Sequence, residues 1–259
     1  MDTSLLITNL PSPQVAVLAL NRPEKRNALN IALIEAIRGG LRRLEGEAAV
    51  RVVIVRGEGP AFCAGLDLQE AGDAGRSGES AEALAGLYLE LCKSDLVSIA
   101  AVHGAVIGGG LGLAAACDLA VASEDVRIVC PEASRGLVAA LVEALLAGQI
   151  LPRHLRELTL LGEALDAHRA LEVGLVNRVV ATPRLTDECL KLAAQVCRGA
   201  PGAIARTKRL LRELSARPIE EEIAIALRYH LQARNSSEAA EGIAAFREKR
   251  QPRWGPRNP

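Results

Sequence analysis

A run of glycines near the middle of the chain is the strongest candidate for chemistry. The stretch "GAVIGGGLGLAAACD" extends from Gly104 to Asp118 and places three consecutive glycines before an alanine-rich segment that is expected to be helical. Glycine lets a ligand approach the main chain closely, and the first amides of a helix have no acceptor within it. Three uses fit this pattern: binding a dinucleotide pyrophosphate, stabilising an oxyanion, or forming a tight turn.

A dinucleotide site fits residues 110–115 (GLGLAA), which match the G-x-G-x-x-G/A fingerprint, with Glu132 near the spacing expected of a ribose-binding acid. The surrounding pattern argues against it. The helix after the glycines is only about eight residues long, and two strands then follow back to back around residues 123–125. A dinucleotide-binding crossover needs a full helix between parallel strands, so the context disfavours nicotinamide or flavin binding. A purely structural turn stays open.

An oxyanion site uses the same glycines differently. Amides in the first turn of a helix point outward with the positive end of the helix dipole, and they attract negative charge. A second unpaired amide facing them would let the pair hold a thioester oxygen as it becomes an enolate, worth roughly 3 kcal/mol per donor. The loop "AFCAGLDL" offers such an amide after Gly65.

Composition indicates a globular protein without an overall preference for polyanions. The chain has 259 residues, 49% of them hydrophobic but only 2% aromatic, so an aliphatic core is expected. Lysine plus arginine balance aspartate plus glutamate at 31 each, which favours neither nucleic acid nor an anionic membrane surface. The six cysteines show no C-x-x-C pair and no metal-ligand spacing, so we expect buried thiols and no metal site. Without a basic leader or a long apolar run, a soluble protein of a reducing cytoplasm is expected.

The hydrophobic pattern predicts strands and helices in alternation up to about residue 137. The expected strands are Leu5–Thr8 and Gln14–Leu20 as a hairpin, followed by "RVVIVRG", "SIAAVHG", "DLAVA" and "VRIVC". Helices are expected over Ile31–Leu44, with Asn30 as N-cap, and over Ala81–Lys93. The segment "GEGPAFCAGLDLQE" is expected to be a turn-rich loop, and Ala71–Ser80 a mobile surface segment.

The remainder of the chain is expected to be mostly helical. The expected helices are Val138–Ala147, His154–Leu161, Asp166–Leu171, Leu185–Arg198, Ala203–Arg212, Ile219–Gln232 and Glu238–Lys249. The simplest division is an α/β domain over residues 1–200 and a helical region over residues 201–259, with the boundary near Pro201.

Six motifs, in order and at normal intervals, resemble those of one protein family. They are "NRPEKRNALN", "GPAFCAGLDL", "IAAVHGAVIGGGLGLAAACDLAVAS", "CPEASRGL", "EVGLVNRVV" and "AAFREKRQPRW". Together they are similar to the crotonase (enoyl-CoA hydratase/isomerase) superfamily over nearly the whole chain. The resemblance implies a spiral of ββα units with a C-terminal helical region for trimerisation. It also implies an acyl-CoA or enoyl-CoA substrate, and a homotrimer or a dimer of trimers that binds no nucleic acid or membrane.

The resemblance assigns the binding positions residue by residue. The amides of Leu66 and Gly109 would form the oxyanion hole, although ordinary turn amides stay an alternative. No cofactor is implied beyond the CoA of the substrate. The positions implied for CoA are Lys25 and the main chain near Ala28, then Ala64, Asp67 and Leu68 near the adenine, and Phe246 and Lys249 from a neighbouring subunit. Taken alone, Lys25 fits a solvated surface charge equally well.

The acids decide the expected reaction. Hydratases of the superfamily have one glutamate two residues after the glycine run and a second in a Pro-Glu pair. This chain has Glu132 at the second position but Gly112 at the first, so a single carboxyl group that shuttles a proton between carbons is expected. Enoyl-CoA isomerisation is therefore favoured. The alternatives are enoyl-CoA hydratase (lyase) activity in fatty-acid β-oxidation and a weakly catalytic protein that binds CoA esters.

Several nearby residues complete this interpretation. Where relatives sometimes have an aspartate, eight residues after the Pro-Glu glutamate, this chain has Ala140. Glu143 could substitute as an acid, although an exposed position on a helix is the simpler expectation. His103 and Asp118 are expected to be structural, and Cys130 a buried thiol.

Overall fold

The protein is described here by a computed structural model of the chain. The structure describes residues 4–67, 70, 77–135 and 137–214, and the single positions 237, 241, 245, 248, 250 and 253. The chain divides into two compact units, Met1–Lys191 and Leu192–Pro259.

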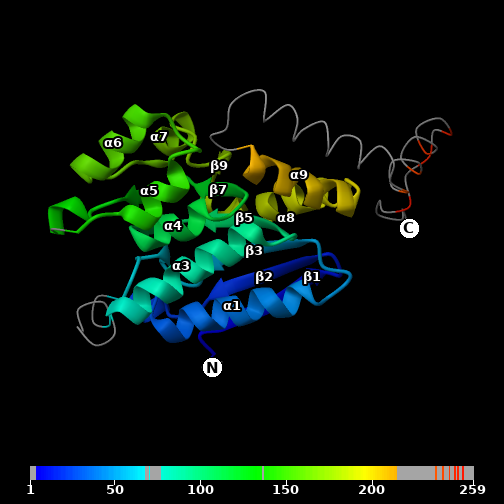
Figure 1. The fold of residues 1–259 in the computed structure, drawn as a ribbon, viewed down its shortest axis with the longest axis horizontal. Coiled ribbons are helices and arrows are strands. Elements are labelled where there is room, and N and C mark those ends of the chain that lie inside the picture. Colours follow the sequence, from blue (N-terminus) through cyan, green and yellow to red (C-terminus); the bar gives the residue numbers. More distant parts are fainter. Residues whose placement is uncertain are drawn as a thin grey trace. The chain divides into compact units, whose positions relative to one another are not determined.

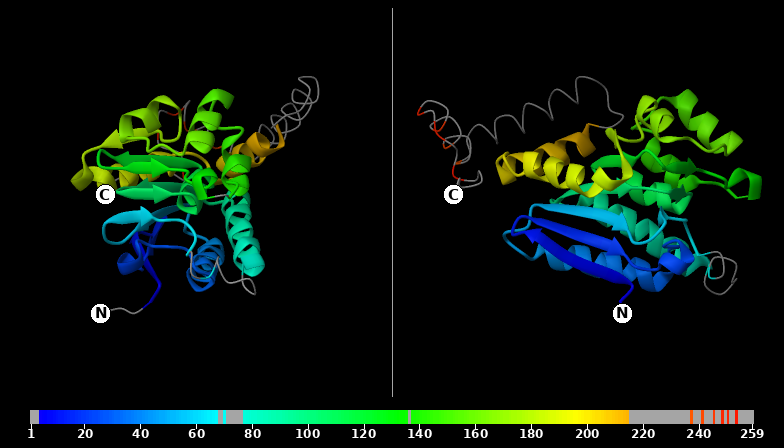
Figure 2. Two further views of the ribbon diagram at one scale, coloured as in Figure 1. Left: turned by 90° about the vertical axis from the view of Figure 1, so that its left-hand side faces the viewer. Right: turned by 180° about the vertical axis from the view of Figure 1, so that it is seen from behind.

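The first unit is built on a six-stranded sheet (Figures 1 and 2). Its strands, in spatial order, are β1 (Leu6–Ser12), β2 (Val15–Leu20), β3 (Val52–Gly57), β5 (Val97–Val102), β7 (Leu119–Ser123) and β9 (Arg178–Val180). β1 and β2 pair antiparallel, which confirms the predicted hairpin, and every later pair is parallel. All residues of β2 and β5 are buried, as expected for strands covered on both faces.

A second sheet consists of three parallel strands of three residues each, β4 (Ala61–Cys63), β6 (Ala105–Ile107) and β8 (Arg127–Val129). The chain therefore repeats a ββα unit whose first strand joins the large sheet and whose second joins the small one. The prediction of a loop through 61–63 was wrong, and β6 and β9 were not predicted. β8 lies within the predicted strand "VRIVC", whereas β4, β6 and β9, which also have three residues each, are too short to show a hydrophobic alternation.

The helices of the first unit lie between the strands along the chain. They are α1 (Ile31–Glu45), α3 (Ser77–Lys93), α4 (Gly109–Ala115), α5 (Ala140–Leu146), α6 (Pro152–Leu161) and α7 (Ala167–Glu172), with short 3-10 helices η1 (Pro23–Lys25), η2 (Ala133–Arg135) and η3 (Thr182–Arg184). The predicted cap of α1 is confirmed, since the Asn30 side chain accepts a hydrogen bond from the Leu33 amide at 2.9 Å. α3 begins four residues earlier than predicted, so Ser77–Ser80 is helical rather than mobile surface.

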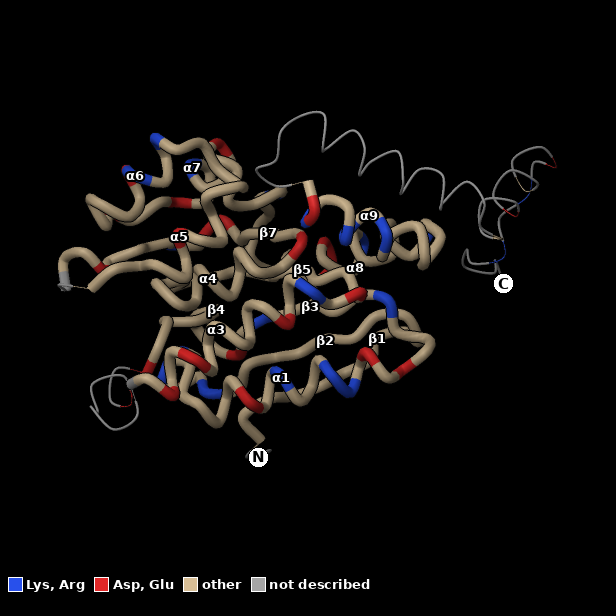
Figure 3. The backbone as a smooth tube through the Cα atoms, in the orientation of Figure 1, with Lys and Arg blue, Asp and Glu red and all other residues tan. Residues whose placement is uncertain are grey.

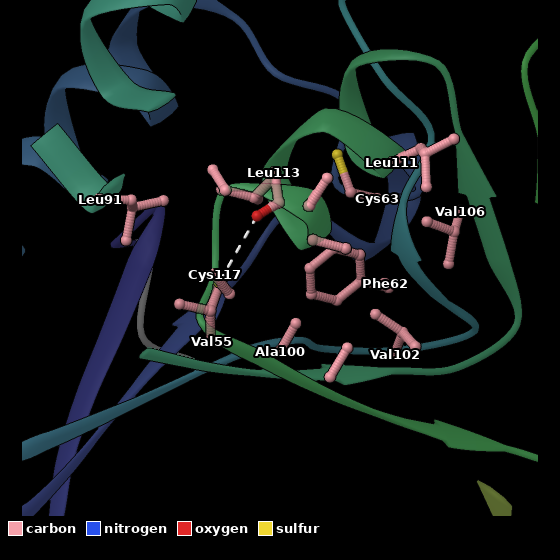
Figure 4. Close-up of a cluster of buried hydrophobic side chains, with 14 of the residues drawn as sticks. Val55, Phe62, Cys63, Leu91, Ala100, Val102, Val106, Leu111, Leu113 and Cys117 are labelled. Carbon is pink, nitrogen blue, oxygen red and sulfur yellow. Dashed lines mark hydrogen bonds between the residues drawn. The ribbon is translucent and has the colours of Figure 1, made fainter. Parts of the chain in front are cut away.

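The glycine-rich helix α4 has seven residues, and all of them are buried. A Cβ added to Gly110 would lie 2.9 Å from the carbonyl carbon of Cys63, so this glycine is required by the close approach of β4. Beneath it, the Phe62 ring is enclosed by aliphatic side chains that include Val55, Val102 and Leu111 (Figure 4). The brevity of α4 confirms that the crossover from β5 to β7 lacks the full helix of a dinucleotide-binding unit.

Charge is distributed unequally between the helices (Figure 3). α1 and α3 lie side by side, and Glu90 on α3 accepts hydrogen bonds from Arg38 at 2.7 Å and from Arg42 at 2.8 Å on α1. α4, in contrast, carries no charged residue. Five of the six cysteines are buried and Cys92 is half-buried, so the expectation of buried thiols is confirmed for five.

The second unit contains the last residues of α8 (Leu185–Val196) and all of α9 (Pro201–Glu213). Near its end, Arg250 pairs with Glu241 at 2.6 Å. The predicted helix Ile219–Gln232 and most of Glu238–Lys249 lie outside the described residues. Among the helices that the structure describes, none has the length and apolar character needed to cross a membrane.

Candidate active site

Two main-chain amides approach each other where β4 and β6 end. Gly109 is the first residue of α4, and a Cβ built on it would lie 3.4 Å from the Leu66 nitrogen. The neighbours of Leu66 are held by Leu29, whose amide donates to the Gly65 carbonyl at 2.7 Å and whose carbonyl accepts from the Asp67 amide at 2.9 Å. Neither the Leu66 nor the Gly109 amide donates a hydrogen bond to another described residue. The pair is therefore available to a ligand oxygen.

Glycines on both sides make this approach possible. Gly65 has a φ of +89°, and a Cβ there would lie 2.7 Å from the Ile107 carbonyl oxygen and 3.3 Å from the Gly109 nitrogen. Gly108 has a φ of +49°, and a Cβ there would collide with the carboxyl group of Glu132. Any side chain at either position would be strained as well as obstructed. The two glycines thus allow Leu66, Gly109 and Glu132 to meet.

Glu132 follows β8 and directs its carboxyl group at the start of α4. Its Cδ lies 3.2 Å from the position that a Cβ of Gly108 would take. Its Oε2 is buried and has no hydrogen-bond partner among the described residues, so Glu132 is not the solvated acid of the simpler interpretation. Burial and the neighbouring Glu132 carboxyl raise the pKa of the Cys130 thiol, which stays protonated. An unpartnered carboxylate oxygen is costly to bury unless a ligand completes it.

A cavity of about 350 Å³ connects these groups. Ala64, Gly65, Leu66, Gly108, Gly109 and Glu132 line it, together with Tyr88, Ile107, Ala81, Leu84 and residues 137–142. Of the described residues that line the cavity, Glu132 is the only one with a carboxyl group. The arrangement can polarise a carbonyl group and move one proton beside it.

The loop before α1 adjoins this site through Arg22. The Arg22 guanidinium donates to the Ala28 carbonyl at 2.6 Å and pairs with Asp67 at 3.1 Å, and both side chains of that pair are largely buried. The amide of Ala64, which lines the cavity, donates to the Arg26 carbonyl at 2.9 Å. Three positions implied for CoA, Ala28, Ala64 and Asp67, are thereby brought together.

The sequence profile of the enoyl-CoA hydratase/isomerase family matches residues 12–257. The chain belongs to this family. It is 35% identical over 262 residues to a carnitinyl-CoA dehydratase of Proteus mirabilis, covering 98% of this chain and 99% of the relative. It is 34% identical over 264 residues to a mevalonyl-coenzyme A hydratase of Aspergillus fumigatus, covering 96% and 94% of the two chains.

Solved structures confirm the crotonase fold expected for this family member. The enoyl-CoA hydratase of Mycobacterium smegmatis superposes with a TM-score of 0.92 at 31% identity, over 97% of this chain and 99% of the other. An enoyl-CoA hydratase of Polaromonas gives a TM-score of 0.90 at 31% identity, over 96% and 98%. The enzyme class is therefore that of the enoyl-CoA hydratase/isomerase family.

The remaining predicted positions of this family member divide into three groups. Lys25 lies in η1 beside the loop described above, but it is exposed and does not line the cavity. Ala140 does line the cavity, whereas Glu143 is half-buried on α5 and does not. Leu68, Phe246 and Lys249 lie outside the described residues.

His103 and Asp118 make structural contacts, as predicted. The ring Nε2 of His103 lies 3.0 Å from the Gly59 carbonyl oxygen. The carboxyl group of Asp118 accepts hydrogen bonds from the amide of Ser98 at 2.7 Å and from its hydroxyl at 2.9 Å. These bonds tie the end of the short helix to β5, and neither residue lines the cavity.

Sequence reasoning missed three residues that shape this family site. Tyr88 on α3 lines the cavity and donates to the Gly109 carbonyl at 2.5 Å. The side chain of buried Asn27 accepts from the Arg22 amide at 2.9 Å and donates to the Glu58 and Ala61 carbonyls. Arg22 and Asn27 stand inside the motif "NRPEKRNALN", whose polar residues gave a signal. The sequence around Tyr88 gave no such signal, because its pattern is that of a helix packed on the core.

Proposed function

We propose that this protein shifts the double bond of an enoyl-CoA thioester. The amides of Leu66 and Gly109 hold the thioester oxygen, and Glu132 carries the proton. The observation behind this proposal is that Glu132 is the only carboxyl group among the described residues lining the cavity, and that one of its oxygens is buried without a partner.

The reaction has two proton transfers through one residue. With a 3-enoyl-CoA, the Glu132 carboxylate removes a proton from C2, and the electron pair moves to the carbonyl oxygen to give a dienolate. The two amides stabilise that negative charge, at roughly 3 kcal/mol each. The protonated Glu132 then returns the proton to C4, which leaves the double bond between C2 and C3. The carboxylate is regenerated, so the cycle needs no water and no second acid.

The cavity also supports a substrate class. Much of the cavity lining is aliphatic, contributed by residues 137–142, Ala81 and Leu84. Relatives act, by their names, on carnitinyl and mevalonyl thioesters, whose acyl groups carry a quaternary ammonium ion or hydroxyl groups. Burying such groups without partners would cost several kcal/mol. An unsubstituted aliphatic acyl chain therefore suits this cavity better.

Hydration is the second candidate, and the names of the relatives favour it. Adding water to C3 requires a group that orients the water in addition to a group that protonates C2. At the position where the resemblance implies a glutamate with this additional carboxyl group, the chain has Gly112. We therefore rank hydration below isomerisation for this chain.

The test compares two substrates on three proteins. Wild type should convert 3-hexenoyl-CoA to its 2-enoyl isomer faster than it hydrates crotonyl-CoA. Glu132→Gln should lower kcat for isomerisation about 100- to 10,000-fold, while Glu143→Gln, on a side chain outside the cavity, should change it less than about twofold. Faster hydration than isomerisation by wild type would assign the reaction to the hydratases. Tight CoA-ester binding without turnover would indicate a binding protein.

CoA contacts, assembly and compartment stay proposals that rest on the resemblance and on composition. We propose that Lys25, Ala28, Ala64, Asp67 and Leu68 contact CoA. Phe246 and Lys249 of a neighbouring subunit would close the pocket in a trimer or a dimer of trimers. The proposed compartment is the cytoplasm. Light scattering tests the assembly through its mass. Lys25→Ala should raise KM for CoA esters without changing kcat if the lysine contacts a phosphate.

A further inference from the structure

Tyr88 is a buried phenol that the proposed proton transfer does not use. It lies on α3, is 3% exposed, and lines the cavity that contains Glu132. Its hydroxyl donates to the carbonyl oxygen of Gly109 at 2.5 Å. Burial, with smaller effects from Cys63 and Glu132, raises its pKa well above the ordinary value, so the phenol keeps its proton.

The hydrogen bond of Tyr88 fixes the Gly109–Gly110 peptide, which directly follows the peptide that carries the Gly109 N–H. The Gly108 amide donates to the Val129 carbonyl at 2.9 Å, and the Gly108 carbonyl accepts from the Gly112 amide at 3.1 Å. Gly109 itself has no side chain to restrict its rotation. Tyr88 holds the carbonyl on the far side of the Gly109 Cα, so the main chain is anchored both before and after the Gly109 N–H.

The ring of Tyr88 also closes position 112. A Cβ built on Gly112 would lie 2.6 Å from Cζ and 2.8 Å from Cε2 of Tyr88, and it would collide with the hydroxyl oxygen. The ring is packed in place, because Leu84, Leu87 and Leu91 of the same helix are buried in the core, so a side chain at residue 112 would have to push the ring out of this position. Tyr88 and a side chain at residue 112 are therefore mutually exclusive.

We propose that Tyr88 is a positioning residue that aims the Gly109 amide at the thioester oxygen, and that its ring restricts the cavity to one carboxyl group. This inference rests on the proposed role of the Gly109 amide. Tyr88 acts through Gly109 and takes no proton in the reaction. A residue with this role should affect carbonyl polarisation and kcat more than substrate affinity.

The decisive variant is Tyr88→Phe, which keeps the ring and removes the hydroxyl. The probe is a 3-aryl-acryloyl-CoA, a conjugated thioester whose absorption moves to longer wavelength when its carbonyl is polarised. Wild type should shift the band, and Tyr88→Phe should shift it less and lower kcat about tenfold with KM within about twofold. An unchanged band and kcat in Tyr88→Phe would overturn the proposal.

Thr159→Val is the matched control. The buried Thr159 hydroxyl also donates to a main-chain carbonyl, that of Leu155 at 3.0 Å, but Thr159 does not line the cavity. Both variants should lose some stability, and only Tyr88→Phe should alter the band. If wild type itself produces no shift, the oxyanion site of the proposed function fails. A shift of equal size in wild type and Tyr88→Phe removes only the role of Tyr88.

A second variant tests the closure of position 112. Gly112→Ala should displace the phenol and reproduce the loss seen with Tyr88→Phe. In a Tyr88→Leu background the added methyl group should cost less than it does alone, because the ring it displaces is absent. Equal costs in both backgrounds, or a fully active Gly112→Ala, would show that the ring does not close this position.

Discussion

The two walls of the cavity are built in different ways. At the polar wall, main-chain groups and Glu132 meet through Gly65 and Gly108, where an added Cβ would meet other atoms at contact distances too short for a real side chain. The aliphatic wall consists of residues 137–142, and parts of it are open to solvent, with Leu137 54% and Val138 77% exposed. The polar wall therefore tolerates no change in shape, while the aliphatic wall can change side chains without moving the main chain. We therefore expect that substitutions in the polar wall alter the rate of reaction, and that substitutions in the aliphatic wall alter the preference for acyl chain length.

The largest expected effect is a change of shape at the polar wall. Gly110→Ala would place a methyl group 2.9 Å from the Cys63 carbonyl carbon, so the start of α4 must move away from β4. Displacing the Gly109 amide should lower kcat about 100-fold or more for any substrate. Steady-state kinetics with a series of enoyl-CoA chain lengths measure this loss.

Gly148→Ala is its control, because an added Cβ there would meet nothing within 4 Å. It should retain wild-type kcat. A Gly110→Ala protein that is folded and fully active would contradict the claim that the polar wall tolerates no change in shape.

A smaller and selective effect is expected at the aliphatic wall. Ala140→Leu adds three carbons to a residue that lines the cavity. It should lower kcat/KM for 3-decenoyl-CoA about tenfold, as expected when burial of one or two methylene groups is lost, and for 3-butenoyl-CoA less than twofold.

Ala147→Leu, at the end of the same helix and outside the cavity, should change neither value. Equal losses for both chain lengths in Ala140→Leu would mean that this wall also shapes the chemistry.

A change on the charged surface should affect stability alone. Burial raises the pKa of Glu90, but hydrogen bonds from Arg38 and Arg42 outweigh it, and the pKa lies below its ordinary value. Glu90→Gln should therefore lower the free energy of unfolding by about 1 kcal/mol at pH 7 and leave kcat unchanged. Urea denaturation at several pH values measures the difference.

The contribution of Glu90 to stability depends on pH, because its pKa differs between the folded and the unfolded chain. As the pH falls below about 4.3, the unfolded chain binds the proton before the folded one does, so the contribution of Glu90 declines. The difference between wild type and Glu90→Gln should shrink toward pH 3. A difference that grows on acidification would contradict the ion-pair assignment.

The smallest expected effect is a difference in stability between alanine variants of two adjacent glycines of α1. An added Cβ at Gly39 would meet nothing within 4 Å, whereas at Gly40 it would lie 2.9 Å from a methyl carbon of Leu6. Gly39→Ala should stabilise the protein by about 0.5–1 kcal/mol, and Gly40→Ala should stabilise it less or destabilise it. Thermal unfolding of both variants, with unchanged kcat, tests this. Equal gains would mean that the Gly40 contact is easily relieved.

Periodic elements could be predicted from the sequence, whereas three of the four three-residue strands could not. The hairpin, the capped helix α1 and the buried strand β3 each show a pattern longer than one period, and each is present. The strands β4, β6 and β9 have three residues each, so their pairing is decided by neighbours far away in the chain.

The same distinction applies to the site. The glycine run and the Pro131-Glu132 pair mark the main-chain amide and the acid directly in the sequence, and the structure brings both to one cavity. The approach of Tyr88 to Gly112 joins two helices and depends on their packing distance, which no local pattern records. Arg22 bridging Ala28 to Asp67 is likewise a tertiary contact.

A crystal structure with bound hexanoyl-CoA, a saturated thioester that cannot react further, tests the central claim most directly. The thioester oxygen should lie about 2.7–3.1 Å from both the Leu66 and Gly109 nitrogens, with the Glu132 carboxyl group within about 3.5 Å of C2. A thioester oxygen bound to only one of these nitrogens or to neither, or a Glu132 carboxyl group turned away from C2, would contradict the account.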